Sequence, residues 1–474
     1  MKHKIILLVA TNLLITSLTF AQFNNPAKSL KVSADGHHLQ FSDGSSFFWM
    51  GDTAWELFHR LDKKETDYYL ETRATQGFNV IQAVVLAELY GLTEPNREGN
   101  LPFFEQNPEK PNEKYFEHVD YVVKKAADLG LFIALLPTWG DKWNKQWGQE
   151  DVIFNPENAQ KFGAFLGNRY KNQWNIIWVM GGDRNPENDE HFKIIRSMAK
   201  GLEDGDGGKH LFTFHPTGDN TSSSFFHNDK WLDFNMTQSG HGDRSGPNYI
   251  FTLNNYNLTP AKPCLDGEPR YEDIPVRFWE IKVEEKYKGK NPVEFPDSLA
   301  TLGYFDDYDV RRAAYWSVFS GACGHTYGNG SVWCFWDKGR FAPIAIRFPW
   351  QKAMLSPGAE DMGHLRKLID QFGMNELVPD RSVVTHNTPF PSKYIAALRT
   401  KSGNAILAYC PEGQTIRIAL TKLSGKNLTQ QWYNPREGTF TDKTAVETAK
   451  TMGDFVPPTK GDKNDWVLVI QGNK

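Results

Sequence analysis

The sequence predicts an α/β protein in which a (β/α)8 TIM barrel precedes a small C-terminal antiparallel β-sandwich. Three observations support this fold class: eight short apolar runs alternate with amphipathic stretches between residues 30 and 372, polar residues follow many of these runs, and short strands separated by turns take over afterwards. Eight parallel strands are the number that closes such a barrel. A doubly wound open sheet is the competing fold, but no glycine-rich dinucleotide loop follows the first run.

The eight apolar runs are the expected barrel strands. They cover residues 47–50, 78–85, 131–136, 175–180, 211–214, 234–237, 263–266 and 321–327. Apolar residues at helical spacing predict helices between and after them, at residues 113–129, 158–170, 191–202, 311–319 and 362–372. Residues 30–45 contain the turn signal Asp43-Gly44, so we expect a hairpin that closes the bottom of the barrel.

The C-terminal part has the pattern of an all-β domain. Expected strands lie at residues 393–398, 404–409, 415–420, 430–433 and 466–470, with turn signals such as Ser402-Gly403 and Asn434-Pro435 between them. We therefore expect a barrel domain with its hairpin at residues 26–375 and a β-sandwich domain at residues 379–474.

The N-terminus has the features of a targeting signal. Lys2 and Lys4 precede an apolar stretch that ends at Thr19-Phe20-Ala21, which predicts a signal peptide at residues 1–21, cleaved after Ala21. A buried N-terminal helix is the alternative, but nothing caps this segment or makes it amphipathic. We expect a periplasmic or extracellular product without a membrane span, because no later apolar run approaches the roughly 18 residues that a span needs.

Composition excludes several classes of protein. The 474 residues include 53 basic and 57 acidic ones, a net charge of −4, with no basic block of the kind that nucleic-acid binders use. The four cysteines are too few for a disulfide scaffold, and their pairing cannot be deduced. No His-x-His or His-Glu-x-x-His pattern occurs, so we expect neither a metal nor a cofactor. Aromatic residues make up 14 % of the chain, which suits stacking on sugars as well as a large core.

Two carboxylates at expected strand ends are the candidate catalytic pair. Asp183 follows the fourth strand and Glu268 follows the seventh, so a closed barrel places them opposite each other. A pair about 5–5.5 Å apart lets one carboxylate attack an anomeric carbon while the other protonates the leaving oxygen. The alternative is structural, with each acid capping a helix or pairing with Arg184 or Arg270.

Other residues near the expected strand ends form the candidate substrate-binding set. They are Asp52, Trp55, Gln82, Trp139, Trp143, Arg184, His215, Gln238, Arg270, Tyr271, His325 and Tyr327. Structural roles remain open for them: the aspartate could cap a helix, the tryptophans could cover the barrel rim, and the histidines could be packed against the backbone.

Three motifs resemble those of a known family. They are FWMGDTAWE at residues 48–56, WVMGGDRN at residues 178–185 and LDGEPRYE at residues 265–272. With the arrangement of the chain from about Pro26 onward, they are similar to glycoside hydrolase family 140, the apiosidases. The chain departs from the larger clan of retaining glycosidases in one respect, because Gly182-Asp183 stands where that clan usually has Asn-Glu.

The resemblance implies a barrel followed by a small sandwich that is often labelled collagen-binding. It implies hydrolysis of the bond between apiose and galacturonic acid in the pectin rhamnogalacturonan II, with an oligo- or polysaccharide as the partner molecule. In this family the aspartate of Gly-Gly-Asp is the general acid/base, here Asp183, and the glutamate of Gly-Glu-Pro is the nucleophile, here Glu268.

These roles make electrostatic demands on the site. Glu268 must be ionised, which requires hydrogen-bond donors, and Asp183 must hold a proton, which burial and the charge of Glu268 would favour. The expected donors to Glu268 are Arg270, Tyr271, Tyr327 and His325.

An anionic pectic substrate also predicts a basic cleft. Its expected residues are Arg184, Arg270, Lys142 and Arg244. Two alternatives stay open: another pentosidase or hexosidase specificity on the same barrel, or a non-catalytic carbohydrate-binding or adhesion protein. The sequence does not determine the oligomeric state.

Overall fold

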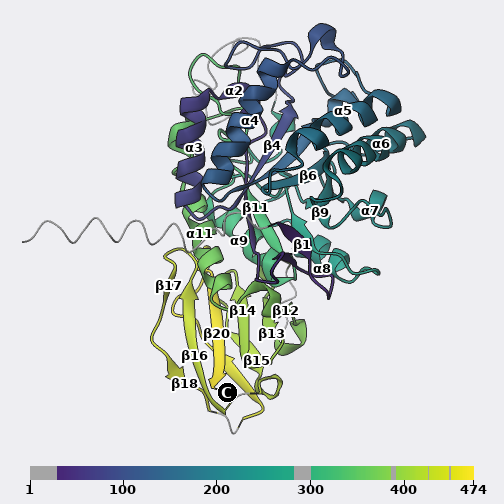
Figure 1. Cartoon of the computed structure of the whole chain (residues 1–474). Helices are drawn as coiled ribbons and strands as arrows, with labels where there is room; N and C mark the ends of the chain where they lie inside the picture. Colours follow the sequence, from purple (N-terminus) through teal and green to yellow (C-terminus); the bar gives the residue numbers. More distant parts are fainter. Residues whose placement is uncertain (1–28, 282–299, 386–390, 425, 448–449, 474) are drawn as a thin grey trace, which may run out of the picture.

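The computed structural model describes residues 29–281, 300–385, 391–424, 426–447 and 450–473. A helix-rich part is stacked on a β-rich part (Figure 1). The expected signal peptide, and residues 26–28 at the start of the expected barrel domain, lie outside the described residues. Within the described residues, no helix is both long and apolar enough to cross a membrane.

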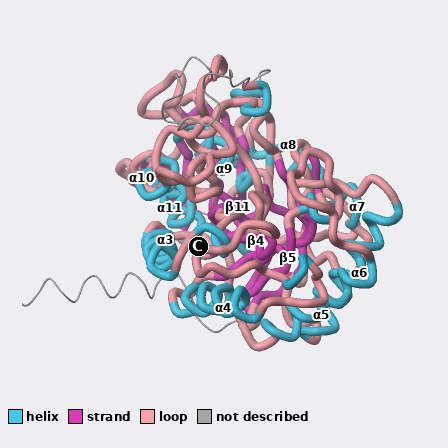
Figure 2. The backbone as a smooth tube through the Cα atoms, turned by 90° about the horizontal axis from the view of Figure 1, so that it is seen from above, coloured by secondary structure: helices cyan, strands magenta, loops and turns pink. Residues whose placement is uncertain are grey.

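The helix-rich part is a (β/α)8 barrel, as predicted. Its strands are β3 (Trp49–Thr53), β4 (Val80–Leu86), β5 (Phe132–Thr138), β6 (Ile176–Gly181), β7 (Phe212–His215), β9 (Asn235–Gln238), β10 (Cys264–Asp266) and β11 (Gly324–Tyr327). They pair in the order β7-β6-β5-β4-β3-β11-β10-β9, and the short strand β8 (Asn220–Thr221) adds antiparallel to β9. Figure 2 shows these strands at the centre of a ring of helices.

The seam between β7 and β9 closes the barrel. The backbone N–H of Asp233 donates to the carbonyl of Phe212 at 2.9 Å, and the hydroxyl of Thr213 donates to the carbonyl of Phe234 at 2.7 Å. The open doubly wound sheet is therefore excluded, because its edge strands would not meet.

Ten α-helices are described in and around the barrel. They are α2 (Leu57–Arg60), α3 (Lys63–Thr75), α4 (Glu113–Asp128), α5 (Pro156–Tyr170), α6 (Asp189–Asp206), α7 (Ser223–Phe226), α8 (Tyr249–Tyr256), α9 (Asp307–Phe319), α10 (Trp350–Ala353) and α11 (Pro357–Asp370). Side-chain caps define the first residue of several helices, which the apolar pattern alone did not predict accurately. Asp306, for example, accepts from the backbone N–H of Asp309 in a capping box, so α9 begins four residues before the expected Arg311.

Side chains alternate along each strand between the barrel interior and the helix layer. Val80 and Val84 of β4 belong to the interior cluster, whereas Ile81 and Val85 face the helices. The four cysteines of the chain are buried free thiols.

The expected hairpin lies at the N-terminal end of the barrel. Strands β1 (Leu30–Val32) and β2 (Leu39–Phe41) pair antiparallel, and Phe41 and Phe47 pack against Phe132 at the start of β5. The predicted turn at Asp43-Gly44 is present after β2, where Gln40 and Ser46 form an antiparallel bridge, but the turn between β1 and β2 lies earlier, at residues 34–37.

The β-rich part is the predicted antiparallel sandwich. Its strands are β12 (Leu377–Pro379), β13 (Ala396–Thr400), β14 (Ala405–Cys410), β15 (Ile416–Ala419), β16 (Lys426–Asn434), β17 (Thr439–Phe440), β18 (Thr444–Ala445), β19 (Met452–Phe455) and β20 (Trp466–Asn473). Strands β15 and β19 form a two-stranded sheet, and the others form a seven-stranded one. The sequence pattern missed β19, since only Phe455 of its four residues is buried.

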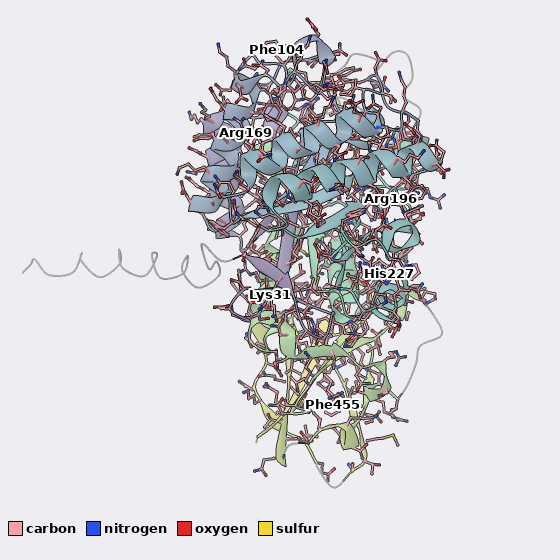
Figure 3. The ribbon with its side chains drawn as sticks, turned by 45° about the vertical axis from the view of Figure 1, so that its right-hand side comes forward. Lys31, Phe104, Arg169, Arg196, His227 and Phe455 are labelled. Atoms are coloured by element: carbon pink, nitrogen blue, oxygen red, sulfur yellow. The ribbon has the colours of Figure 1, made fainter. Side chains whose placement is uncertain are left out.

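The sandwich lies far from the face of the barrel that carries the loops after the strands. Phe104, in the loop after β4, and Phe455, in β19, lie at opposite ends of the molecule (Figure 3). The C-terminal ends of the barrel strands, where barrel enzymes place their reactive groups, therefore open away from the sandwich.

Candidate active site

A tight turn after β6 presents Asp183. Gly181, Gly182 and Asp183 all have positive φ, at 96°, 96° and 54°. A Cβ on Gly181 would meet the carbonyl oxygen of His215 at 2.4 Å, and one on Gly182 would meet the backbone nitrogen of Gly140 at 2.8 Å, so both positions need glycine. The Asp183 side chain remains 20 % exposed, which keeps it accessible to a substrate.

Glu268 follows β10 and is held by two histidines. Its side chain is almost fully buried, with His215 Nε2 at 3.0 Å from Oε2 and His241 Nε2 at 3.1 Å from Oε1. Gly267 before it packs against Met236, where a Cβ would lie 2.5 Å from the sulfur. The backbone therefore passes close to β9, and the carboxylate faces the end of β7.

His215 contacts the backbone of Asp183 on one side and the carboxylate of Glu268 on the other. The backbone N–H of Asp183 donates to its Nδ1 at 3.2 Å, so Nδ1 is the acceptor and a neutral ring carries its proton on Nε2. That proton faces Glu268. One imidazole ring therefore separates the residue that follows β6 from the carboxylate that follows β10.

The two carboxyl groups have opposite pKa shifts. Burial and the nearby charge of Glu268 raise the pKa of Asp183 to about 6, against the opposing influence of Arg184 and His215. Burial also disfavours the ionised form of Glu268, but its contacts with His215 and His241 outweigh this and lower its pKa to about 2. A proton shared by the pair resides on Asp183.

Aromatic residues form one wall of the site around His215. The rings of Trp55 and Trp139 lie 5.3 and 6.0 Å from the imidazole and 5.2 Å from each other. The indole N–H of Trp55 donates to the hydroxyl of Tyr271 at 3.1 Å, and burial together with the charge of Glu268 raises the pKa of this tyrosine. The wall excludes water from the side of Glu268.

Two glutamines and an arginine also contact the two carboxylates or the backbone beside them. Gln82 in the barrel interior donates to the carbonyl of Gly267 at 2.8 Å, which fixes the backbone next to Glu268. Gln238 hydrogen-bonds the carboxyl of Asp183. Arg184 Nη1 lies 2.8 Å from the carbonyl oxygen of Asp183 and 3.3 Å from its Oδ2.

Three of the candidate binding residues face the helix layer instead, which corrects the prediction. Asp52 lies inside β3, because this strand runs to Thr53, and its Oδ2 accepts from Arg73 of α3 at 2.7 Å. Tyr327 donates to Glu272 at 2.6 Å, and His325, two residues earlier on β11, is buried on the same outward side. The sequence pattern ended the first strand at Met50, three residues before β3 ends, so the direction of Asp52 was misassigned. The eighth run ended correctly at Tyr327, and there the alternation along β11 turns both side chains outward.

Two further candidates hold loops instead of facing the site. Trp143 is buried beneath the loop after β5 and donates to the carbonyl of Gly181 at 3.3 Å. Arg270 donates to the carbonyls of Asp243 and Gly246, so it anchors the loop after β9.

The expected basic cleft and donor set also need correction. Lys142 is fully buried, 2.9 Å from both Asp141 and Glu150, and Arg244 pairs with Asp309, so neither offers an unpaired positive charge. Among the expected donors only Tyr271 contacts Glu268. His215 and His241 contact Glu268 in place of the other expected donors.

Sequence reasoning missed three residues of the site. His241 lies three residues after the end of β9, and Glu88 two residues after the end of β4, which is the signal that could have found them. Burial and the charges of Asp183 and Asp141 raise the pKa of Glu88 to about 8. Trp147 lies against Arg184 in the loop after β5.

The described residues contain no group of three or more His, Cys, Asp or Glu side chains placed to hold a metal ion. The arrangement instead supplies a carboxyl that keeps its proton up to about pH 6, an ionised carboxylate and an aromatic wall, the elements of two-carboxylate glycoside hydrolysis.

Comparisons with known proteins agree with this chemistry. One solved structure, described as a glycoside hydrolase, shares 31 % identity at a TM-score of 0.79 and covers 94 % of this chain and 97 % of its own. Another, a glycoside hydrolase family 5 structure from Bacteroides vulgatus ATCC 8482, shares 31 % identity at a TM-score of 0.81, covering 94 % of this chain and 93 % of its own. A search of curated proteins gave no match.

Two family profiles divide the chain between them. The profile described as "Putative collagen-binding domain of a collagenase" matches residues 378–471, which are the sandwich. The profile described as "Apiosidase-like, catalytic domain" matches residues 33–376, which are the barrel and its hairpin. The chain therefore belongs to the apiosidase-like family, and it is a glycoside hydrolase that acts on a carbohydrate substrate.

Proposed function

We propose that this enzyme hydrolyses the bond between apiose and galacturonic acid in the pectin rhamnogalacturonan II. Membership of the apiosidase-like family supports this choice of sugar. The proposed reaction is retaining, with Asp183 as the general acid/base and Glu268 as the nucleophile.

The observation that carries the mechanism is the pair of opposite pKa shifts across His215. The pKa of Asp183 is raised by burial and by Glu268, whereas the contacts with His215 and His241 keep Glu268 ionised despite its burial. Two carboxyls whose pKa values are driven apart in one site are typical of an acid and a nucleophile.

The reaction follows in two steps. Glu268 attacks the anomeric carbon, and as the bond to the leaving oxygen breaks, the proton of Asp183 passes to that oxygen. The negative charge of Glu268 is then lost in the ester, so the pKa of Asp183 falls and its carboxylate can accept a proton from water. The resulting hydroxide attacks the same carbon, and Glu268 leaves as the carboxylate with the sugar's configuration retained.

Incubation with rhamnogalacturonan II oligosaccharides tests the proposal. We expect release of apiose, identified by mass spectrometry, with a proton NMR spectrum of the first product that shows the substrate's anomeric configuration. Release of another sugar would contradict the apiose specificity, and the opposite configuration would contradict the retaining mechanism.

Variants of the two carboxylates test the catalytic roles. Asp183→Ala and Glu268→Gln are each expected to abolish turnover while the Tm stays within a few degrees, since neither side chain is part of the apolar core. Thermal collapse of both variants, with activity surviving in the folded fraction, would favour a structural role for the pair.

We also propose that the enzyme is exported, on the basis of the signal-peptide pattern of residues 1–21. N-terminal sequencing of the protein from the producing cell should begin at Gln22. Retention of Met1 in a cytoplasmic fraction would contradict this.

A further inference from the structure

Trp147 is an exposed indole beside the candidate acid. It lies in the loop between β5 and α5, and 53 % of its surface is exposed. One face of the ring is covered, because the guanidinium carbon of Arg184 lies 3.7 Å from the ring centroid. Arg184 itself is fully buried, so the indole shields the charge from water on one side and leaves its other side free.

The loop that carries Trp147 is attached to the loop that carries Asp183. Asn144 donates to the carbonyl of Asn185 at 3.0 Å and to Glu187 at 3.2 Å, and Gln146 donates to the other oxygen of Glu187 at 2.7 Å. Gln146 also has a φ of 35°, a conformation that non-glycine residues rarely adopt. The position of Trp147 relative to Asp183 is therefore held by these loop contacts and by Arg184 on one face of the ring.

This position determines which part of a substrate the indole can reach. Arg184 contacts the Trp147 ring with its face and the Asp183 carboxyl with Nη1, at 3.3 Å from Oδ2. An acid that protonates the leaving oxygen must face the leaving group, not the sugar that becomes attached to Glu268. The free face of Trp147 therefore borders the leaving-group side of the site.

We propose that Trp147 is a stacking platform for the leaving-group sugar of the substrate, and so a positioning residue for the acid step. The inference rests on the proposed function, because it takes Asp183 as the acid. A flat, rigid indole with one free face suits the apolar face of a pyranose ring such as a uronic acid. Trp55 and Trp139 are buried beside His215 and cannot take this role.

Two substrates with different leaving groups test the platform. One is apiosyl-galacturonic acid, whose leaving group is a sugar ring, and the other is apiosyl fluoride, whose leaving group has none. We expect Trp147→Ala to lower kcat/KM for the disaccharide about tenfold, mainly through KM, and Trp147→Phe to restore part of the loss. For the fluoride we expect kcat/KM within about twofold of the wild type.

Tyr68→Ala is the matched control. Tyr68 is an aromatic residue that is 44 % exposed on α3, where its ring contacts Trp350 in the outer helix layer. This variant should treat both substrates as the wild type does. Equal losses on the two substrates with Trp147→Ala, or no loss on the disaccharide, would overturn the platform.

A binding experiment separates this proposal from the apiose specificity. If the wild type cleaves neither substrate, the apiose proposal fails, and the platform is then tested with rhamnogalacturonan II oligosaccharides by titration calorimetry. The platform predicts weaker binding for Trp147→Ala than for the wild type and Tyr68→Ala. Equal affinities, or no binding by the wild type, would overturn it.

Discussion

His241 supplies one of the two imidazole contacts that keep Glu268 ionised in a buried position. Its Nε2 lies 3.1 Å from Oε1 of the carboxylate, and this contact offsets part of the rise in the pKa of Glu268 that burial causes. In a two-carboxylate mechanism the acid limb of the pH profile reports the nucleophile, and the basic limb reports the general acid. The shifts of Glu268 and Asp183 thus predict activity that falls as pH rises through about 6.

Replacing His241 should move the acid limb of that profile. In His241→Phe the carboxylate loses a donor while staying buried, so the pKa of Glu268 rises and the loss of kcat/KM at low pH begins at a higher pH. The basic limb should move less, because Asp183 retains its contact with His215. Rates measured from pH 3 to 9 on the best natural oligosaccharide give both limbs.

His37→Phe provides the control for this experiment. His37 lies in the N-terminal hairpin, where it stacks on Tyr256 at 4.0 Å, far from the strand ends that carry the site. Its profile should match that of the wild type. An acid limb that stays in place in His241→Phe would show that this contact does not set the ionisation of Glu268.

At the level of the strands, the barrel could be predicted from the sequence because the number and order of the hydrophobic runs do not change when a predicted strand boundary is wrong by a few residues. The same errors are decisive for side-chain direction, since a shift of one residue sends a side chain to the opposite face. Asp183, Glu268 and His215 were found because each follows its strand or closes it, whereas Asp52 was expected after a strand that extends to Thr53. The positions of His241 and Trp147 in the site depend on the conformation of long loops, and the hydrophobic pattern of the sequence does not predict loop conformation.

Glu272 links three elements around the barrel mouth and titrates in an unusual range. The hydroxyl of Tyr327 on β11 donates to it at 2.6 Å, and the N–H of Gly358 in the first turn of α11 donates at 3.1 Å. Burial is the main reason that its pKa rises from 4.5 to about 7. The folded protein therefore holds this proton more tightly than the unfolded chain does.

The raised pKa gives a pH dependence of stability with a definite sign. The contribution of Glu272 is fully present below about pH 4.5 and is lost as pH rises through about 7. Glu272→Gln stays neutral throughout, so the fall in unfolding free energy between pH 5 and 8 should shrink, by at most about 3 kcal/mol. Urea unfolding at both pH values measures the change. Glu117→Gln, on the exposed face of α4, should keep the wild-type dependence, and an identical fall in Glu272→Gln would contradict the assignment.

The barrel and the sandwich share a core across their junction. Tyr315 and Phe319 of α9 pack against Tyr409 of β14 at 4.8 and 6.2 Å, within one buried cluster that also includes residues of α11 and β20. Such an apolar junction makes the sandwich a stabilising support for the barrel, because separation would expose this surface on both. The active site lies at the C-terminal ends of the barrel strands, on the side away from the sandwich, so support and catalysis are spatially separate.

A buried ion pair lies within that junction, and its removal tests how strongly the two parts are coupled. Arg311 of α9 donates to both oxygens of Asp465, at 2.9 and 3.0 Å, and to Asp361 of α11 at 2.6 Å. Asp465 is fully buried, so Asp465→Ala leaves a buried guanidinium with one partner fewer and should cost about 3–5 kcal/mol of unfolding free energy. Asp204→Ala, which removes an exposed partner of Lys200, should cost at most about 1 kcal/mol.

Urea unfolding followed by tryptophan fluorescence and by activity distinguishes support from catalysis in these variants. In Asp465→Ala both signals should shift together to lower urea, while kcat/KM of the folded enzyme in the absence of urea stays near that of the wild type, since the pair touches no residue of the site. An unfolding midpoint equal to that of Asp204→Ala would mean that the apolar cluster alone joins the two parts. A loss of kcat/KM without a loss of stability would mean instead that the sandwich acts on the catalytic face through α9.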